Sequence, residues 1–198
     1  MQPKDPSDPG RRKFLIASTS VVGTVGVAGA AIPFLSALKP SAKAQAAGAP
    51  TKVDISKLEK GEMMLVEWRG LPIYIIRHNT ESLKALKQNI SRLLDPDSKE
   101  DQQPEYARNE NRSRREDIVV LEAVCTHLSC APKFYPELGS NEFDDNWQGG
   151  FFCPCHGSKF DLAGRVYSGV PAPTNMSVPP HYYESENILV IGEDGELT

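Results

Sequence analysis

Two short stretches of the chain decide what it can fold into: CTHLSC at residues 125–130 and CPCHGS at residues 153–158. Together they contain all four cysteines and two of the four histidines of the protein. Three residues that tend to end β-strands lie within these two stretches or just beyond them: Pro132, Pro154 and Gly157. The 22 residues between the two stretches leave room for separate strands to carry the two loops. Such loops can face each other across one metal centre.

The loops offer six side chains of types that bind metal ions: Cys125, His127, Cys130, Cys153, Cys155 and His156. A structural zinc site takes four ligands, usually two of them at C-x2–4-C spacing, so six candidates at these spacings fit it poorly. Attachment of c-type haem needs C-x-x-C-H, and the second loop is one residue short of that motif. Two disulfides alone would leave both histidines unexplained.

A Rieske centre accounts for all six side chains. In such a centre two cysteines hold one iron and two histidines hold the other iron of a 2Fe–2S cluster. The two cysteines left over are expected to form a disulfide in an oxidising compartment. The spacing does not tell which cysteine of each loop is the ligand.

Around the loops the pattern is mainly β. Short β-rich or apolar runs predict strands at 63–68, 72–77, 118–124, 150–153, 159–162, 166–168 and 188–192. Arg69-Gly70 predicts a hairpin turn between the first two. Leucine and isoleucine at three-to-four spacing predict one helix over 80–94, which Asp95-Pro96 would end.

Several polar groups outside the two loops are interpreted as ordinary surface or packing residues. The charged stretch 98–115 predicts an exposed loop, and its basic run 112–115 is expected to be solvated. His78 and His181 are expected at the surface, whereas Trp68 and Trp147 are expected to pack inside.

The N-terminal part has a composition of its own. Residues 14–38 contain no charge, and 25 residues at about 1.5 Å each suffice to cross a hydrocarbon core of about 30 Å. Arg11, Arg12 and Lys13 precede this run, so the positive-inside rule places residues 1–13 in the cytoplasm and the globular part on the other side. Residues 39–50 are small and weakly apolar, and are expected to form a flexible tether.

The string GRRKFL resembles a twin-arginine export signal, and Ala44-Gln45-Ala46 offers a cleavage site. Secretory signal cores are about 7–15 residues long, so the longer run here favours a retained anchor over a cleaved signal. The net charge is +4 before residue 51 and −8 after it. An acidic globular part argues against nucleic acid as a partner.

Taken together, CTHLSC, CPCHGS and the later GVPAP at 169–173 resemble the iron–sulfur subunit of ubiquinol–cytochrome c reductase, the cytochrome bc complex. QQPEYARN and FFCPCHGSKFDLAGRV resemble its proteobacterial branch. The resemblance implies a Rieske-type antiparallel β-sandwich over residues 51–198, with a cluster-binding subdomain at about 120–175 and one inserted helix. It also implies a single transmembrane helix at 14–38 in the bacterial inner membrane, with the globular domain in the periplasm.

The resemblance also implies roles for individual residues. Cys125 and Cys153 would hold the inner iron, and His127 and His156 the outer iron, with His156 meeting the quinol. Cys130 and Cys155 would form a disulfide that joins the loops. Ser158 would donate its hydroxyl to a bridging sulfide, and the 169–173 loop would cover the third side. The remaining neighbours of the cluster would be Leu128, Phe160 and Pro171.

Two residues depart from the family pattern. Ser129 stands where many relatives have glycine, and Phe160 stands where mitochondrial members have a tyrosine whose hydroxyl donates to a cysteine sulfur. Losing that donor predicts a lower reduction potential.

The function implied is that of a catalytic subunit in redox-coupled proton translocation. It would take an electron and a proton from ubiquinol beside a cytochrome b subunit and pass the electron to a membrane-bound c-type cytochrome. Its complex would be dimeric and embedded in inner-membrane lipid. A Rieske ferredoxin serving an oxygenase is the second hypothesis, against which the anchor, the export signal and the spare cysteine pair count. A membrane-anchored zinc domain is the third.

Overall fold

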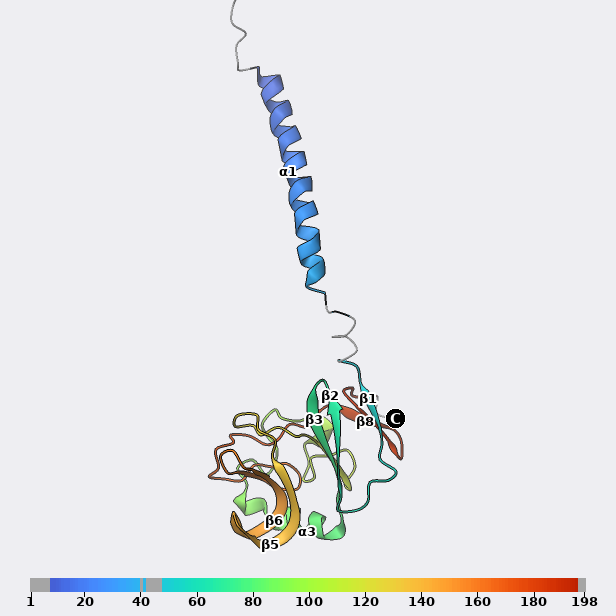
Figure 1. The fold of residues 1–198 in the computed structure, drawn as a ribbon, viewed down its shortest axis with the longest axis vertical. Coiled ribbons are helices and arrows are strands. Elements are labelled where there is room, and N and C mark those ends of the chain that lie inside the picture. Colours follow the sequence, from blue (N-terminus) through green and yellow to red (C-terminus); the bar gives the residue numbers. More distant parts are fainter. Residues whose placement is uncertain (1–7, 40, 42–47, 196–198) are drawn as a thin grey trace, which may run out of the picture. The chain divides into compact units, whose positions relative to one another are not determined.

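The computed structural model describes residues 8–39, 41 and 48–195, and the chain divides into two units, residues 1–46 and 47–198. In the first unit, helix α1 spans Pro9–Ala37 and is long and apolar enough to cross a membrane (Figure 1). It begins five residues before the expected start, because Asp8 caps it by accepting from the backbone N–H of Gly10, and proline suits the first helical turn. Most of the expected tether lies outside the described residues.

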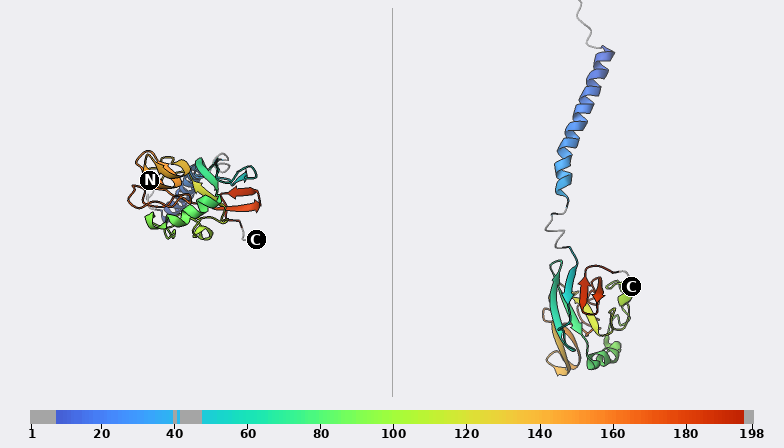
Figure 2. Two further views of the ribbon diagram at one scale, coloured as in Figure 1. Left: turned by 90° about the horizontal axis from the view of Figure 1, so that it is seen from below. Right: turned by 90° about the vertical axis from the view of Figure 1, so that its right-hand side faces the viewer.

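The second unit is built from three antiparallel sheets of three strands each, which confirms the mainly β expectation (Figures 1 and 2). The first sheet has the order β1-β9-β8 and contains Thr51–Asp54, Ile188–Ile191 and His181–Ser185. The second has the order β2-β3-β4 and contains Met63–Trp68, Leu71–Arg77 and Ile118–Glu122. The third has the order β5-β6-β7 and contains Lys133–Asn141, Asp144–Cys153 and Ser158–Phe160.

The β2-β3-β4 sheet separates two apolar cores. Successive side chains of a strand point to opposite faces, and β4 is buried on both. Val119 and Leu121 belong to the core that contains Cys125 and Cys153, whereas Ile118 and Val120 belong to the core beside β1 and β9. This continuous apolar strand leads directly into the first of the two Cys/His loops, so the loop stands on the best-packed element of the fold.

The inserted helix is shorter than predicted. Helix α3 spans Thr80–Gln88 and begins with a capping box between Asn79 and Ser82. A short 3-10 helix, Ile90–Arg92, follows it. The predicted helix does not continue to residue 94 because Leu93 turns inward to pair with Tyr167. Tertiary pairing here overrides helical periodicity.

Three expectations about surface residues were wrong. The stretch 98–115 contains a 3-10 helix, Glu105–Ala107, and buries Arg112 among other polar side chains. His78 and His181 are also buried. Each of these groups is covered by segments distant in sequence, which local polarity does not reveal. The expectation that Trp68 and Trp147 pack inside is confirmed.

Candidate metal centre

The first loop leaves β4 and is closed by its own backbone. The N–H of Cys125 donates to the carbonyl oxygen of Cys130 at 2.8 Å, and the N–H of Ser129 donates to that of Cys125 at 2.9 Å. Ser129 takes a φ of 62°, in the left-handed region. These bonds fold CTHLSC into a compact turn with Cys125 at its base.

The second loop is the turn of the β6–β7 hairpin. Cys153 ends β6 and pairs in register with Ser158, which begins β7. The N–H of Gly157 donates to the carbonyl oxygen of Cys153 at 2.9 Å, and Gly157 has a φ of 76°. The hairpin therefore fixes Cys153 at the base of the turn, and Cys155 and His156 lie within the turn itself.

A disulfide between Cys130 and Cys155 joins the two loops, with a Cα–Cα distance of 6.7 Å. The expected pairing is therefore confirmed. The sulfurs of Cys130, Cys153 and Cys155 lie within 4.8 Å of one another, but the disulfide uses two of them, so only Cys153 of this group can supply a thiolate.

Cys125 and Cys153 are the free cysteines, at 1% and 2% exposure, and they hydrogen-bond to each other. Burial raises the pKa of Cys153, and the neighbouring Cys125 thiol raises it further, whereas the backbone N–H of Cys155 lowers it. A buried pair of thiols becomes a pair of thiolates when a metal centre replaces the protons. The pair is therefore suited to holding iron.

The two histidines of the loops lie side by side. Their ring centroids are 4.7 Å apart and the rings are perpendicular. His156 is exposed, and His127 is half-buried. The Nδ1 atom of His127 is buried without a hydrogen-bond partner among the described residues, and such an atom needs one. A metal ion coordinated at Nδ1 would satisfy it.

A third segment, residues 169–175, is tied to both loops. The hydroxyl of Ser158 accepts from the backbone N–H of Ala172 at 3.0 Å, and the hydroxyl of Thr126 donates to the carbonyl oxygen of Thr174 at 2.7 Å. Ser158 is fully buried, whereas Leu128 is 65% exposed and Pro171 is exposed. The role of Thr126 was not predicted, because its partner lies 48 residues further along the chain.

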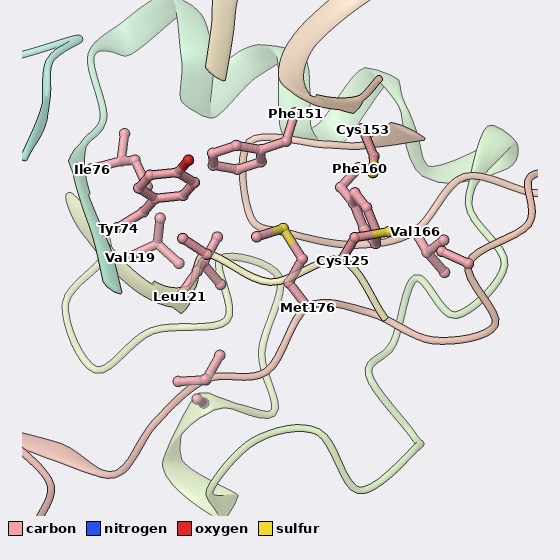
Figure 3. Close-up of a cluster of buried hydrophobic side chains, with 14 residues drawn as sticks. Tyr74, Ile76, Val119, Leu121, Cys125, Phe151, Cys153, Phe160, Val166 and Met176 are labelled. Carbon is pink, nitrogen blue, oxygen red and sulfur yellow. The ribbon is translucent and has the colours of Figure 1, made fainter. Parts of the chain in front are cut away.

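Phe160 lies on the cysteine side of the centre. It is fully buried in the same core as Cys125 and Cys153, and Figure 3 shows its ring beside both side chains. Its backbone pairs with Phe151 of β6. No hydroxyl is present on this ring, so a donor is missing at this position.

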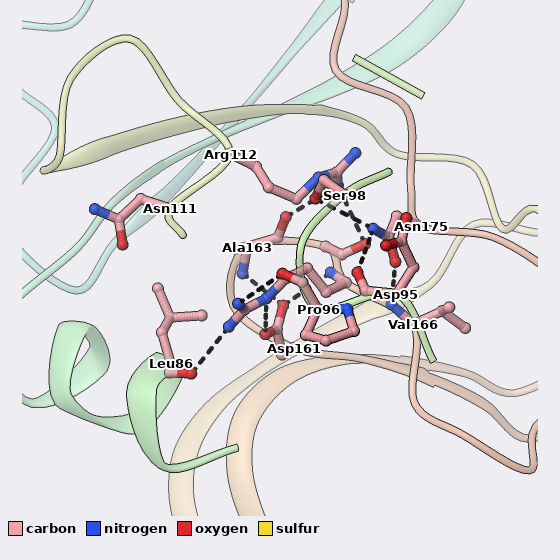
Figure 4. A network of polar contacts seen from close by, with 12 residues as sticks. Leu86, Asp95, Pro96, Ser98, Asn111, Arg112, Asp161, Ala163, Val166 and Asn175 are labelled. Carbon is pink, nitrogen blue, oxygen red and sulfur yellow. Dashed lines mark hydrogen bonds and ion pairs between the residues drawn. The ribbon is translucent and has the colours of Figure 1, made fainter. Parts of the chain in front are cut away.

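A buried polar network gathers around Asp161, Arg165 and Asn175 (Figure 4). Asp161, directly after β7, accepts from Nε of Arg165 at 2.7 Å and from the backbone N–H of Ala163 and of Arg165. Asn175 accepts from the N–H of Val166 at 2.9 Å. Asp161 and Arg165 are only four residues apart, but Arg165 also donates to the carbonyl oxygen of Leu86 and Asn175 to that of Asp95, and such distant bonds leave no local pattern.

Two family models match the chain. One, described as "Ubiquitinol-cytochrome C reductase Fe-S subunit TAT signal", matches residues 1–41. The other, described as "Rieske [2Fe-2S] domain", matches residues 106–180 and spans both loops, so the cofactor is a 2Fe–2S cluster. The first match agrees with the twin-arginine interpretation, and together with α1 it fits a membrane-anchored subunit.

Curated relatives match nearly the whole chain. The "Ubiquinol-cytochrome c reductase iron-sulfur subunit" of Allochromatium vinosum is 49% identical over 184 residues, which cover 93% of this chain and 89% of the relative. The protein of the same name from Blastochloris viridis is 41% identical over 97% of this chain and 98% of its own. The "Cytochrome b-c1 complex subunit Rieske, mitochondrial" of Neurospora crassa is 34% identical over 90% and 69%. The chain therefore belongs to the family of ubiquinol–cytochrome c reductase iron–sulfur subunits, as an electron-transfer component that carries a Rieske 2Fe–2S cluster.

Proposed function

We propose that Cys125 and Cys153 hold the inner iron of the cluster and that His127 and His156 hold the outer iron. One observation carries this assignment: the two loops bring together two buried free cysteines and two histidines whose rings are in contact, with the remaining cysteines closed in a disulfide. The unpartnered Nδ1 of His127 supports coordination through that atom.

When bound, a Rieske cluster takes up one electron at about −150 to +300 mV, higher than all-cysteine plant-type clusters, because neutral imidazoles replace two thiolates. The outer ring nitrogen of each histidine stays free to hold or release a proton. His156 is exposed and is the residue that meets a quinol hydroxyl in this proposal. The exposed Leu128 and Pro171 provide apolar surface beside it for the quinol ring and for the cytochrome b subunit.

Ser158 is placed to act on the cluster while it holds the 169–173 loop. Its oxygen accepts from Ala172, so its own proton is free to be donated to a bridging sulfide. Such a donor stabilises the more negative, reduced form. Phe160 offers no second donor, which supports a lower potential than in relatives with tyrosine there.

In the proposed cycle the chain is a catalytic subunit that takes an electron and a proton from ubiquinol and passes the electron to a membrane-bound c-type cytochrome. The relatives support this, since they are named as subunits of ubiquinol–cytochrome c reductase or of the cytochrome b-c1 complex. We also infer that the complex is dimeric and lies in inner-membrane lipid.

Electron paramagnetic resonance of reduced membranes tests the ligand assignment. The native chain is expected to give a Rieske signal with a low average g value, and His127→Gln or His156→Gln should abolish it together with quinol–cytochrome c reductase activity. His78→Gln, which changes a histidine outside the loops, is the control and should keep the signal. An undiminished signal in either loop variant would contradict the assignment.

Orientation and retention of the anchor need a separate test. Arg11, Arg12 and Lys13 at the start of α1 support a cytoplasmic N-terminus and a periplasmic domain. Sequencing of the mature N-terminus is expected to find the helix retained, and protease added to the periplasmic side should reach the domain. A mature protein that begins near Ala47 would overturn the retained anchor.

A further inference from the structure

Arg112 is a fully buried cation that no carboxylate contacts directly. Its side chain is 0% exposed, and within the described part of the chain its guanidinium donates only to uncharged acceptors. These are the carbonyl oxygens of Ala163 and Gly164, at 3.1 and 3.3 Å, and Oε1 of Gln103 at 2.9 Å. Its Nε has no partner among those residues. A buried charge without an ionic partner costs folding free energy, so a reason other than stability is needed.

Two carboxylates, of Asp161 and Asp95, and one further cation, Arg165, interact with this charge. Asp161 is buried, but it is paired with Arg165, so the two are neutral as a unit (Figure 4). Asp95 is half-buried, and its carboxylate accepts from two backbone N–H groups of the following turn. Burial lowers the pKa of His78 to about 4, so this neighbour is neutral. Burial also lowers the pKa of Arg112, only to about 10, which leaves it charged at neutral pH.

The backbone links this charge to the core that contains Cys125 and Cys153. The carbonyl oxygen of Gly164 that accepts from Arg112 also accepts from the backbone N–H of Met176, at 2.8 Å. Met176 is fully buried in the apolar core that contains Cys125 and Cys153, and Figure 3 shows it beside Cys125. A charge acting through an apolar core is screened less than one acting across the surface.

We propose that Arg112 raises the reduction potential of the cluster by stabilising the charge that the cluster gains on reduction. The inference rests on the proposed ligation by the two loops. Reduction adds one electron, and hence one negative charge, to the cluster that these two loops would hold. A fixed positive charge favours that reduced form. Because Arg112 is buried, its effect persists at high ionic strength.

Redox titrations of the assembled complex, followed by electron paramagnetic resonance, test this role. Arg112→Gln removes the charge and keeps a hydrogen-bonding amide, and Arg112→Lys keeps the charge. At a fixed poise the glutamine variant should lower the reduced-to-oxidised ratio roughly three- to tenfold, the range that Coulomb's law gives for unit charges about 12–25 Å apart at an effective dielectric of about 20. The lysine variant should stay within about twofold of native. Arg108→Gln, which removes a surface cation paired with Asp101 and Glu105, is the control and should leave the ratio unchanged.

Asp161→Asn gives a second, opposite test. This substitution removes a buried negative charge, so it should raise the reduced-to-oxidised ratio. If the network had only a structural role, Asp161→Asn would not shift this ratio in the direction opposite to Arg112→Gln. An unchanged ratio in Arg112→Gln, or an effect that vanishes at high salt, contradicts the inference. If Arg112→Gln does not assemble, the other two variants still test the inference. A large fall of the reduced-to-oxidised ratio in Arg112→Lys, or any fall of it in Asp161→Asn, would contradict the inference. Absence of the Rieske signal from the native chain would instead contradict the proposed function.

Discussion

Ser129 holds a backbone conformation that suits glycine better. Its φ of 62° lies in the left-handed region, where the Cβ atom of an L-residue crowds the following carbonyl oxygen. Ser129→Gly should therefore raise the free energy of unfolding, by about 1 kcal/mol. Denaturant unfolding of the full chain in detergent measures the change.

Ser168→Gly is the matched control for that substitution. Ser168 is also exposed, but it is not among the residues with positive φ. Glycine there only adds conformational freedom to the unfolded chain, so a loss of stability is expected. Equal losses in both variants would contradict the strain at Ser129.

Phe160 is a second single-residue determinant, and its effect is on the cluster. Phe160→Tyr places a hydroxyl in the core beside Cys125 and Cys153, where a cysteine sulfur can accept from it. A donor to sulfur stabilises the reduced form, so the midpoint potential should rise. Phe134→Tyr, at a ring that packs against Phe151 in the same core, is the control and should shift the potential less. A redox titration in which the midpoint potential of Phe160→Tyr is not higher than that of the native chain would contradict this prediction.

At the scale of elements, the β6–β7 hairpin depends on Gly150. A Cβ atom at this residue would lie 2.1 Å from the carbonyl oxygen of Phe160 and 2.8 Å from the backbone of Asp161, and φ is 138°. The backbone cannot yield there without separating the strands that carry the second loop. Gly150→Ala should therefore cost about 3 kcal/mol or more and reduce cluster content.

Gly139→Ala, in the same sheet, separates the effect of a positive φ from that of a steric clash with the added Cβ atom. Gly139 also has a positive φ, of 113°, but nothing lies within 4 Å of the Cβ atom built there. Thermal unfolding and iron content of the full chain should show a smaller loss for Gly139→Ala. Similar losses for the two variants would mean that backbone strain alone, and not the approach of β7, makes glycine necessary at Gly150.

The elements that could be predicted from the sequence are those with a local signal. Strand β2 and its Arg69-Gly70 turn lie where alternation and turn chemistry placed them, and the apolar run of β4 was equally plain. Strand β5 was missed because Pro136 and Gly139 interrupt it and its register shifts twice. Strands β1 and β8 were missed too, since they are short and gain their order by pairing with β9.

The candidate site divides in the same way. Its two loops and the Cys130–Cys155 disulfide followed from motif spacing and family resemblance. Thr126 and Arg112 did not, because a hydroxyl or guanidinium that bonds to a carbonyl oxygen 48 or 51 residues away leaves no local pattern. The motifs and the disulfide were therefore predictable from local sequence, whereas bonds between distant segments were not.

At the scale of the whole globular unit, the cluster loops share one core with the central sheet. Cys125 and Cys153 are packed with Tyr74, Leu121 and Phe151 rather than in a detached lobe. The hydroxyl of Tyr74 donates to the carbonyl oxygen of Pro132, just beyond the first loop, at 2.8 Å. Global unfolding should therefore release the cluster, and conditions that destabilise the whole unit should appear as cluster loss.

Acid is such a condition, because the unit buries two neutral histidines. Burial lowers the pKa of both His78 and His181 to about 4, from 6.5 in the unfolded chain. Between these values the unfolded chain binds more protons than the folded one, so the free energy of unfolding falls as pH falls. Each histidine should account for about 2 kcal/mol of stability lost between pH 7 and pH 5.

The double variant His78→Gln/His181→Gln should consequently flatten this part of the stability profile, even where it lowers stability at pH 7. Denaturant unfolding of the full chain at pH 7, 6 and 5 measures the slope, with iron release as a parallel readout. His78→Gln alone should remove about half of the slope, because each buried ring contributes a separate protonation. A double variant that loses stability on acidification as steeply as the native chain would show that other groups govern the acid response.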